Sequence, residues 1–259
     1  MRLIILIFIF LSYYSISQDW PNTDSIDFDS AIVPKNKLAL IIANTDYTEE
    51  VLKLETPIKD AKLLRNTLDD SLDFDVIYSL DIDLDSMNTL ILQFTDRMKI
   101  YDFGIIYFAG HGMADKYNNS LLVPINFKND YRFNESEILK NTLSSYDIIK
   151  RVRDHKVLFI VDACRTFHEV GSYKKVLEPE SLKLCLSTAF DKPTYENITN
   201  NNSFYAENFC NQLNKQKKQN LNLDLLLKRV KNLVELYSKN NQIPKMYNGD
   251  DLNNIILIR

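Results

Sequence analysis

Glycine is scarce in this sequence. Five glycines occur among 259 residues, whereas ordinary usage of about 7% would supply about 18. Loops that bind phosphate or nucleotide need several glycines close together, and the chain has neither a Walker loop nor a G-x-G-x-x-G motif. The G-x-S-x-G turn of serine hydrolases is missing too. These absences argue against nucleotide binding and against serine-based hydrolysis.

Metal-binding patterns and an excess of charge of one sign are also missing. No C-x-x-C or H-x-x-x-H pair occurs, so the sequence predicts no metal site and no other cofactor. The net charge is −4, which gives no general attraction to nucleic acid or to an anionic membrane surface. The sequence therefore predicts neither as a partner.

Cysteine is rare, and the three cysteines are Cys164, Cys185 and Cys210. An odd number leaves at least one thiol without a partner in the same molecule. Cys185 lies in an apolar run and Cys210 in an amphipathic segment, so both fit a protein core. A disulfide between these two is the alternative, because separation in sequence gives no distance.

The N-terminal segment has the form of a secretory signal peptide. Arg2 supplies a positive charge, residues 3–11 are apolar, and Ser15 and Ser17 are the small residues that precede a cleavage site. A membrane anchor is the alternative, but the apolar run is shorter than the roughly 20 residues that span a bilayer. The sequence therefore predicts a secreted or lumenal protein with no stable membrane span.

The sequence divides into three segments. Residues 1–17 are the predicted signal peptide, residues 18–36 form a polar N-terminal arm, and residues 37–259 form one domain, without an internal repeat or a long linker.

Apolar runs of strand length alternate with amphipathic helical segments over this domain. Strands that are apolar throughout and separated by helices are typical of a mostly parallel sheet with helices on both faces. The fold class predicted is therefore α/β. Strands are expected at residues 37–44, 74–80, 102–110, 156–164, 182–190 and 253–259, and helices at 57–70, 86–99, 144–154, 203–215 and 223–236, the second helix capped by Ser86.

Two residues that can perform chemistry stand at the carboxyl ends of buried strands. His111 follows the strand at 102–110, and Cys164 ends the strand at 156–164. Neighbouring parallel strands lie about 4.8 Å apart, so two such ends can present a thiol and an imidazole to one cleft. The imidazole would take the thiol proton, and the thiolate would attack a carbonyl carbon. We therefore predict Cys164 as nucleophile and His111 as base; the alternative is that each is a structural residue.

Two of the five glycines, Gly110 and Gly112, flank His111. Gly110 would let the chain turn sharply, and Gly112, which has no Cβ, would let its amide approach a substrate closely. Backbone N–H groups placed in this way can stabilise the oxyanion that thiolate attack creates. We predict that the amides of Gly112 and Cys164 form that oxyanion hole.

The other histidines are weaker candidates for the base. His155 precedes a strand and is therefore expected at the opposite end of the sheet from Cys164, while His168 follows Cys164 closely and is the remaining alternative.

The segments YFAGHG (107–112) and VDACR (161–165) resemble the two catalytic motifs of the caspase-like cysteine peptidases. The caspase signature is Q-A-C-[RQG]-G, with a histidine about 50 residues upstream. Here Asp162 replaces its glutamine and Thr166 its last glycine. The first strand and helix and the segments after Cys164 also resemble this family, so the likeness covers residues 37–259. It implies a caspase-like peptidase domain that cleaves protein or peptide substrates through Cys164 and His111.

The residues around the nucleophile resemble the paracaspase-like branch most closely. Paracaspases and metacaspases have one Asp two residues before the nucleophile and another on the first helix, and they cleave after Arg or Lys. Asp162 and Asp60 match these positions. A carboxylate pair in a partly dry pocket would bind an Arg guanidinium strongly and repel an acidic side chain. The resemblance therefore implies an S1 pocket made by Asp60 and Asp162; the alternative for Asp60 is a capping or solvated role on its helix.

Further alternatives stay open within this resemblance. Legumain-like endopeptidases and the transamidase that attaches lipid anchors are secreted relatives with the same placement of His-Gly and Cys. A catalytically inactive caspase-fold protein that binds partners is a second alternative. The family also implies a homodimer through the last strand, and Lys174 and Lys175 are candidate sites of self-cleavage.

Overall fold

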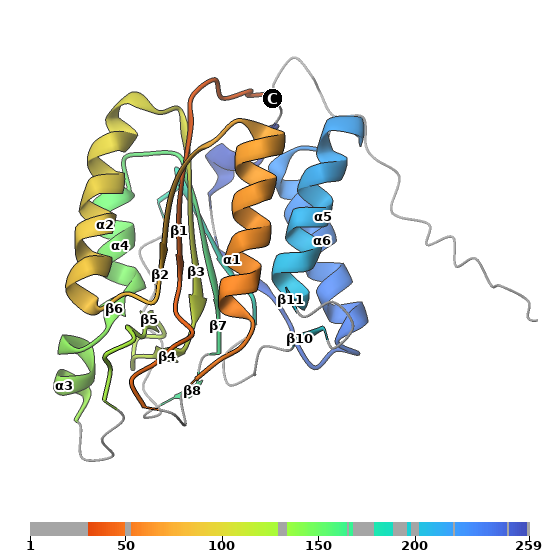
Figure 1. Cartoon of the computed structure of the whole chain (residues 1–259). Helices are drawn as coiled ribbons and strands as arrows, with labels where there is room; N and C mark the ends of the chain where they lie inside the picture. The colour runs from red at the N-terminus through yellow and green to blue at the C-terminus, as the bar shows by residue number, and fades with distance from the viewer. Residues whose placement is uncertain are drawn as a thin grey trace, which may run out of the picture.

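A six-stranded sheet forms the centre of the described part of the chain (Figure 1). The computed structural model describes residues 31–49, 53–128, 134–164, 166–167, 179–188, 196–197, 202–219, 221–247 and 249–257. The strand order is β12-β9-β7-β3-β1-β2, and all neighbours pair in parallel except β12, which is antiparallel to β9. The strands are β1 (Lys37–Ala43), β2 (Asp75–Leu80), β3 (Phe103–Gly110), β7 (Val157–Ala163), β9 (Leu182–Leu186) and β12 (Lys245–Tyr247). The predicted α/β class with a mostly parallel sheet is confirmed.

Helices cover both faces of this sheet (Figure 1). On one face lie α1 (Pro57–Asn66), α5 (Phe204–Gln219) and α6 (Leu223–Tyr237), and on the other lie α2 (Leu84–Arg97) and α4 (Ser145–Val152).

The helix starts follow from local chemistry. Proline stands at the start of α1, where its missing N–H costs no hydrogen bond. The predicted cap of α2 is wrong: the helix begins earlier, and Asp83 caps it by accepting the Ser86 N–H at 2.9 Å. Asp and Ser are nearly equal as N-caps, so the sequence alone does not choose between them.

The apolar strands of the central sheet contribute side chains to two hydrophobic layers, one on each face of the sheet. In β1, Ala39 and Ile41 pack with α1, α5 and α6, while Leu38 and Leu40 pack with α2 and α4. Successive strand side chains point to opposite faces, so a strand covered on both sides is apolar at most of its positions. This is why β1, β3, β7 and β9 are buried along their whole length.

A second, smaller sheet lies beyond the carboxyl ends of β3 and β7, and the sequence did not predict it. Its order is β6-β5-β4-β8, formed by β4 (Gly112–Ala114), β5 (Ser120–Leu122), β6 (Leu143–Ser144) and β8 (Thr166–Phe167). A two-stranded hairpin pairs β10 (Glu196–Asn197) with β11 (Asn202–Ser203). Strands of two or three residues are too short for a hydrophobic period to be recognised.

The strand predicted at residues 253–259 is wrong over residues 253–257, and residues 258–259 lie outside the described part of the chain. A 3₁₀ turn occupies Asp250–Leu252, and Ile255 forms only an isolated parallel bridge with Ile32. The last strand of the sheet is instead β12, a short segment that ends near Gly249 with its left-handed φ of 80°. The homodimer expected through the last strand, at residues 253–259, stays a prediction.

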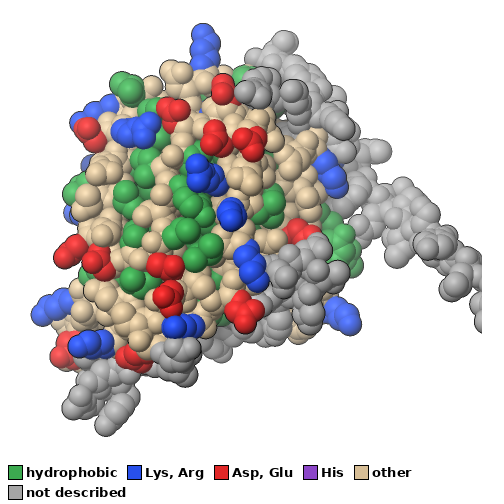
Figure 2. Space-filling view, viewed as in Figure 1, with side chains coloured by type: hydrophobic (Ala, Val, Ile, Leu, Met, Phe, Trp, Pro, Cys, Tyr) green, Lys and Arg blue, Asp and Glu red, His purple; other side chains and the backbone are tan. Residues whose placement is uncertain are grey.

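The surface in Figure 2 has basic and acidic side chains interspersed among apolar ones. No helix in the described part of the chain combines the length and the apolar character that a bilayer crossing requires. Residues 1–17, on which the signal-peptide prediction rests, lie outside the described residues.

Candidate active site

The adjacency of β3 and β7 brings His111 and Cys164 to the same edge of the sheet. The two strands pair in parallel, and Gly110 lies opposite Ala163 in their register. His111 and Cys164 are the next residue of each strand, so both leave the sheet at the same level. Both line a cavity of about 240 Å³, together with Asp60, Asp162 and Ser203.

The side chain of Tyr47 fixes the backbone at His111. Its hydroxyl accepts the His111 N–H at 2.7 Å and donates to the carbonyl of Val123 at 3.3 Å. The two rings lie 4.7 Å apart between centroids, at an angle of 55°. Tyr47 is 1% exposed, so it holds His111 from the side opposite solvent.

Gly110 is required by the approach of Tyr47. Its φ of +154° is rarely adopted by residues with a side chain. A Cβ at this position would lie 2.7 Å from the Tyr47 hydroxyl oxygen and 3.2 Å from the carbonyl oxygen of Asn44. The glycine before His111 therefore allows the tyrosine to reach the histidine backbone.

We expect Gly110→Ala to lower both stability and activity. Strained backbone of this kind costs about 1–3 kcal/mol, and the added methyl group also displaces Tyr47 from His111. Thermal unfolding and peptidase kinetics would measure both effects. Adding Tyr47→Phe removes the clashing oxygen, so the double variant should regain part of the lost stability. An unchanged melting temperature and unchanged turnover in Gly110→Ala would contradict this account.

Gly112 lies against the carboxyl end of β7. A Cβ there would lie 2.7 Å from the backbone oxygen of Cys164 and 2.8 Å from the Cβ of Ala163. The Val123 N–H donates to the His111 carbonyl at 3.1 Å. Since backbone groups alternate in direction along an antiparallel pair, the N–H of Gly112 points away from β5. Gly112 is not among the described residues that line the cavity.

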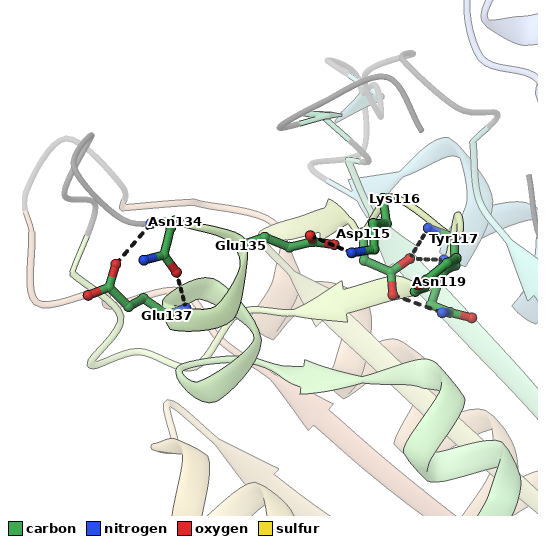
Figure 3. Close-up of polar contacts among 7 residues, drawn as sticks. All are labelled: Asp115, Lys116, Tyr117, Asn119, Asn134, Glu135 and Glu137. Atoms are coloured by element: carbon green, nitrogen blue, oxygen red, sulfur yellow. Dashed lines mark hydrogen bonds and ion pairs between the residues drawn. The ribbon is translucent and has the colours of Figure 1, made fainter. Parts of the chain in front are cut away.

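The hairpin that follows His111 is anchored by the polar contacts of Figure 3. Asp115 accepts the N–H groups of Tyr117 and Asn119 at 2.9 and 2.8 Å and the side-chain amide of Asn119 at 2.8 Å. Lys116 binds Glu135 at 3.0 Å, which ties the hairpin to α3 (Glu135–Lys140). These contacts hold the turn between β4 and β5 and so restrain the chain on the far side of His111.

Asp60 and Asp162 form a buried acidic pair in the cavity wall. Their exposed fractions are 1% and 6%. Asp60 Oδ1 accepts the side-chain amide of Asn202 at 2.7 Å and the N–H of Ser203 at 3.0 Å. Asp162 Oδ2 accepts the hydroxyls of Ser203 at 2.7 Å and Tyr107 at 3.1 Å. Asp162 Oδ1 makes no hydrogen bond with the described residues.

This burial makes the acidic pair hard to ionise fully. Burial, and then the nearby charge of Asp162, raises the pKa of Asp60 to about 7, although Asn202 and Ser203 favour its charged form. Burial also raises the pKa of Asp162, against the hydroxyl groups around it, led by Ser203. No cation of the described residues contributes to either shift. The acidic pair therefore has no positive partner among the described residues that stabilises its charge.

The remaining candidates from the sequence lie elsewhere. Cys185 and Cys210 are free thiols, 0% and 1% exposed, so the structure does not join them in a disulfide. His155 lines a different cavity, of about 570 Å³, with Asp102 and Lys156. The latter two precede β3 and β7, so this cavity lies at the opposite end of the sheet. His168, Lys174 and Lys175 lie outside the described residues.

Sequence reasoning missed three residues of this site: Tyr47, Tyr107 and Ser203. A tyrosine inside an otherwise apolar strand, as at 107, does indicate a buried partner for its hydroxyl. A serine before a helix, as at 203, indicates a cap. Neither signal names the carboxylate that the hydroxyl binds, and no local pattern marks Tyr47.

Comparison with known proteins relates the chain to caspase-like proteins. The family model of the caspase domain matches residues 36–252. The human mucosa-associated lymphoid tissue lymphoma translocation protein 1 is 30% identical over 163 residues, which cover 62% of this chain and 18% of that protein. The paracaspase of Dictyostelium discoideum is 25% identical over 211 residues, which cover 76% of this chain and 50% of that protein.

The match thus spans half or less of each relative's own length. The family model, in contrast, includes every strand of the central sheet and both motif residues, His111 and Cys164. The chain belongs to the caspase domain family.

Proposed function

We propose that the protein is a cysteine endopeptidase that cleaves peptide bonds after Arg or Lys. The observation that carries this proposal is a single cavity lined by Cys164, His111 and the buried carboxylates Asp60 and Asp162. A nucleophile, a base and an acidic binding site thus share one cavity, as cleavage beside a basic side chain requires.

The chemistry assigned to the dyad is acyl transfer in two stages. His111 takes the proton of Cys164, and the thiolate attacks the carbonyl carbon of the scissile bond. The tetrahedral intermediate collapses, the C–N bond breaks, and His111 gives its proton to the leaving amine. Water, deprotonated by His111, then attacks the thioester, which releases the acid product and restores the Cys164 thiol.

The oxyanion is assigned to the amides of Gly112 and Cys164. This is supported by the close contact between Gly112 and the Cys164 backbone, and by a Gly112 N–H that points away from β5. Removing one donor from an oxyanion hole typically costs 10²–10³-fold in rate.

The specificity is assigned to Asp60 and Asp162. Asp162 Oδ1 makes no hydrogen bond of ordinary length with the described residues, although the nearby Ser187 hydroxyl favours the charged form of this carboxylate. A buried acceptor left unsatisfied is costly. The guanidinium of Arg or the ammonium of Lys would supply both the hydrogen bond and the missing positive charge. An acidic substrate side chain would meet only repulsion there.

A library of peptides that varies the residue before the scissile bond tests this function directly. We expect cleavage after Arg and Lys, none after Asp, and none by the Cys164→Ala variant. A preference for Asn would favour a legumain-like specificity instead. No cleavage of any peptide by a folded chain would favour the inactive interaction protein.

A further inference from the structure

Ser203 stands where the chain enters α5, and it borders the acidic pair. It ends β11, directly before Phe204, the first residue of α5. It is 5% exposed and lines the same cavity as Cys164 and His111. It is separated in sequence from both carboxylates, since Asp60 lies on α1 and Asp162 on β7.

Ser203 is the one described residue that hydrogen-bonds both carboxylates. Its N–H donates to Asp60 Oδ1 at 3.0 Å, and its hydroxyl donates to Asp162 Oδ2 at 2.7 Å. Two further side chains each bind a single acid: Asn202 binds Asp60, and Tyr107 binds Asp162.

A third contact ties the Ser203 hydroxyl to α5. The Ser203 hydroxyl oxygen accepts the N–H of Ala206 at 3.0 Å, in the first turn of α5. A hydroxyl has one proton to donate. The acceptor for that proton is Asp162 Oδ2, so this one hydroxyl joins the carboxylate to the first turn of α5.

We propose that Ser203 is a positioning residue that sets the specificity of the site for a basic side chain. It acts through Asp162, whose Oδ2 it holds so that Oδ1 stays available to a substrate cation. It does not touch the reacting atoms. This inference rests on the proposed function, because it assumes that the acidic pair receives the basic side chain.

The alternative is that Ser203 only caps α5, and a comparison of Arg with citrulline substrates separates the two roles. Citrulline has nearly the shape of Arg but no charge, so the ratio of kcat/KM for the two peptides measures how well the pocket recognises the cation. Loss of a cap alone would lower stability and leave this ratio unchanged.

We expect Ser203→Ala to lower the Arg-to-citrulline ratio by about 10- to 100-fold, the usual effect of losing a hydrogen bond to a charged group. The loss should appear in KM for the Arg peptide, with kcat little changed, because the dyad is untouched. Ser203→Thr keeps a hydroxyl and should restore most of the ratio. Ser203→Gly is a second variant without the hydroxyl, and glycine is well tolerated at an N-cap, so it serves if the alanine variant does not fold.

Asn222→Ala is the matched control. Asn222 caps α6 by accepting the Leu225 N–H at 2.9 Å and does not line the cavity. This variant should lose stability and keep the wild-type ratio. If Ser203→Ala and Ser203→Gly keep the wild-type ratio, or lower kcat equally for both peptides, the positioning role is overturned. If the wild-type enzyme itself fails to prefer Arg over citrulline, the proposed function fails instead.

Discussion

Replacing Cys164 by alanine should abolish peptide hydrolysis, with a loss in kcat of about 10⁴-fold or more, as for other nucleophile deletions. The reason is chemical: the acyl intermediate forms on this sulfur, and alanine offers no atom to carry it. Initial rates on an Arg peptide would measure the loss. The fold should persist, because Cys164 is partly exposed and its removal leaves no large cavity.

The two remaining cysteines provide the control for this experiment. Burial raises the pKa values of Cys185 and Cys210 to about 12, so both should stay protonated and inert at neutral pH. Iodoacetamide should therefore label Cys164 in the folded protein and leave the other two unmodified, as mass spectrometry of peptides would show. Cys210→Ala should keep its activity. Residual activity in Cys164→Ala, or equal labelling of all three thiols, would remove the nucleophile assignment.

Replacing Asp162 by asparagine should remove the preference for a basic side chain. Loss of one partner from a buried charge pair costs about 2–5 kcal/mol, so kcat/KM for the Arg peptide should fall by about 30-fold or more. Activity on the citrulline peptide should change little, since a neutral side chain gains nothing from the carboxylate. Asp69→Asn is the matched control, because this exposed acid follows α1 outside the cavity. An unchanged Arg-to-citrulline ratio in Asp162→Asn would show that the specificity lies elsewhere.

The same pair predicts a pH dependence whose sign can be stated. The pKa of Asp60 is raised to about 7 by burial and by Asp162, so a proton bound to the pair competes with a substrate cation below that pH. KM for the Arg peptide should therefore rise as pH falls through about 7, and the citrulline peptide should show no such change. The ratio of the two removes the titration of the dyad, which is common to both. A ratio independent of pH between 5 and 8 would contradict this prediction.

Asp60 and Asp162 should also lower the free energy of unfolding at neutral pH. A carboxyl whose pKa is raised on folding binds its proton more tightly in the folded state, so the folded state loses stability as pH rises from about 4 towards 7. Asp60→Asn keeps the acceptor for Asn202 and Ser203 and removes the charge. Its melting temperature should exceed that of the wild type by a margin that grows over this pH range. A variant that is more stable and less specific would identify the pair as a functional feature rather than a stabilising one.

The sequence was sufficient for the five parallel strands of the central sheet and for the placement of His111 and Cys164 at one edge of it. Each follows an unbroken apolar strand, and parallel strands deliver such residues to a common edge. Asp162 and Asp60 were found through resemblance, not through periodicity, because an Asp inside an apolar strand has no local pattern of its own. Their partners Ser203 and Tyr107 come from distant elements, and only packing brings those elements together.

The wrong predictions near the C-terminus have local structural causes. Residues 253–257 are apolar enough for a strand, yet the left-handed Gly249 and the turn at Asp250–Leu252 redirect the chain before this segment can join the sheet. The edge strand β12 has three residues and half-exposed side chains, which leave no hydrophobic signal. A hydrophobic period appears in a sequence because buried positions are apolar. Short strands at the edge of a sheet bury few side chains and therefore show no clear period.

The pairing of Gly110 with Ala163 has a consequence for how this protein is made. During synthesis, His111 leaves the ribosome well before Cys164, and the two motifs meet only when non-local pairing of β3 with β7 is complete. Such long-range pairing forms late in folding. On the proposed function, a nascent or misfolded chain would therefore lack the assembled pair of Cys164 and His111 on which cleavage depends.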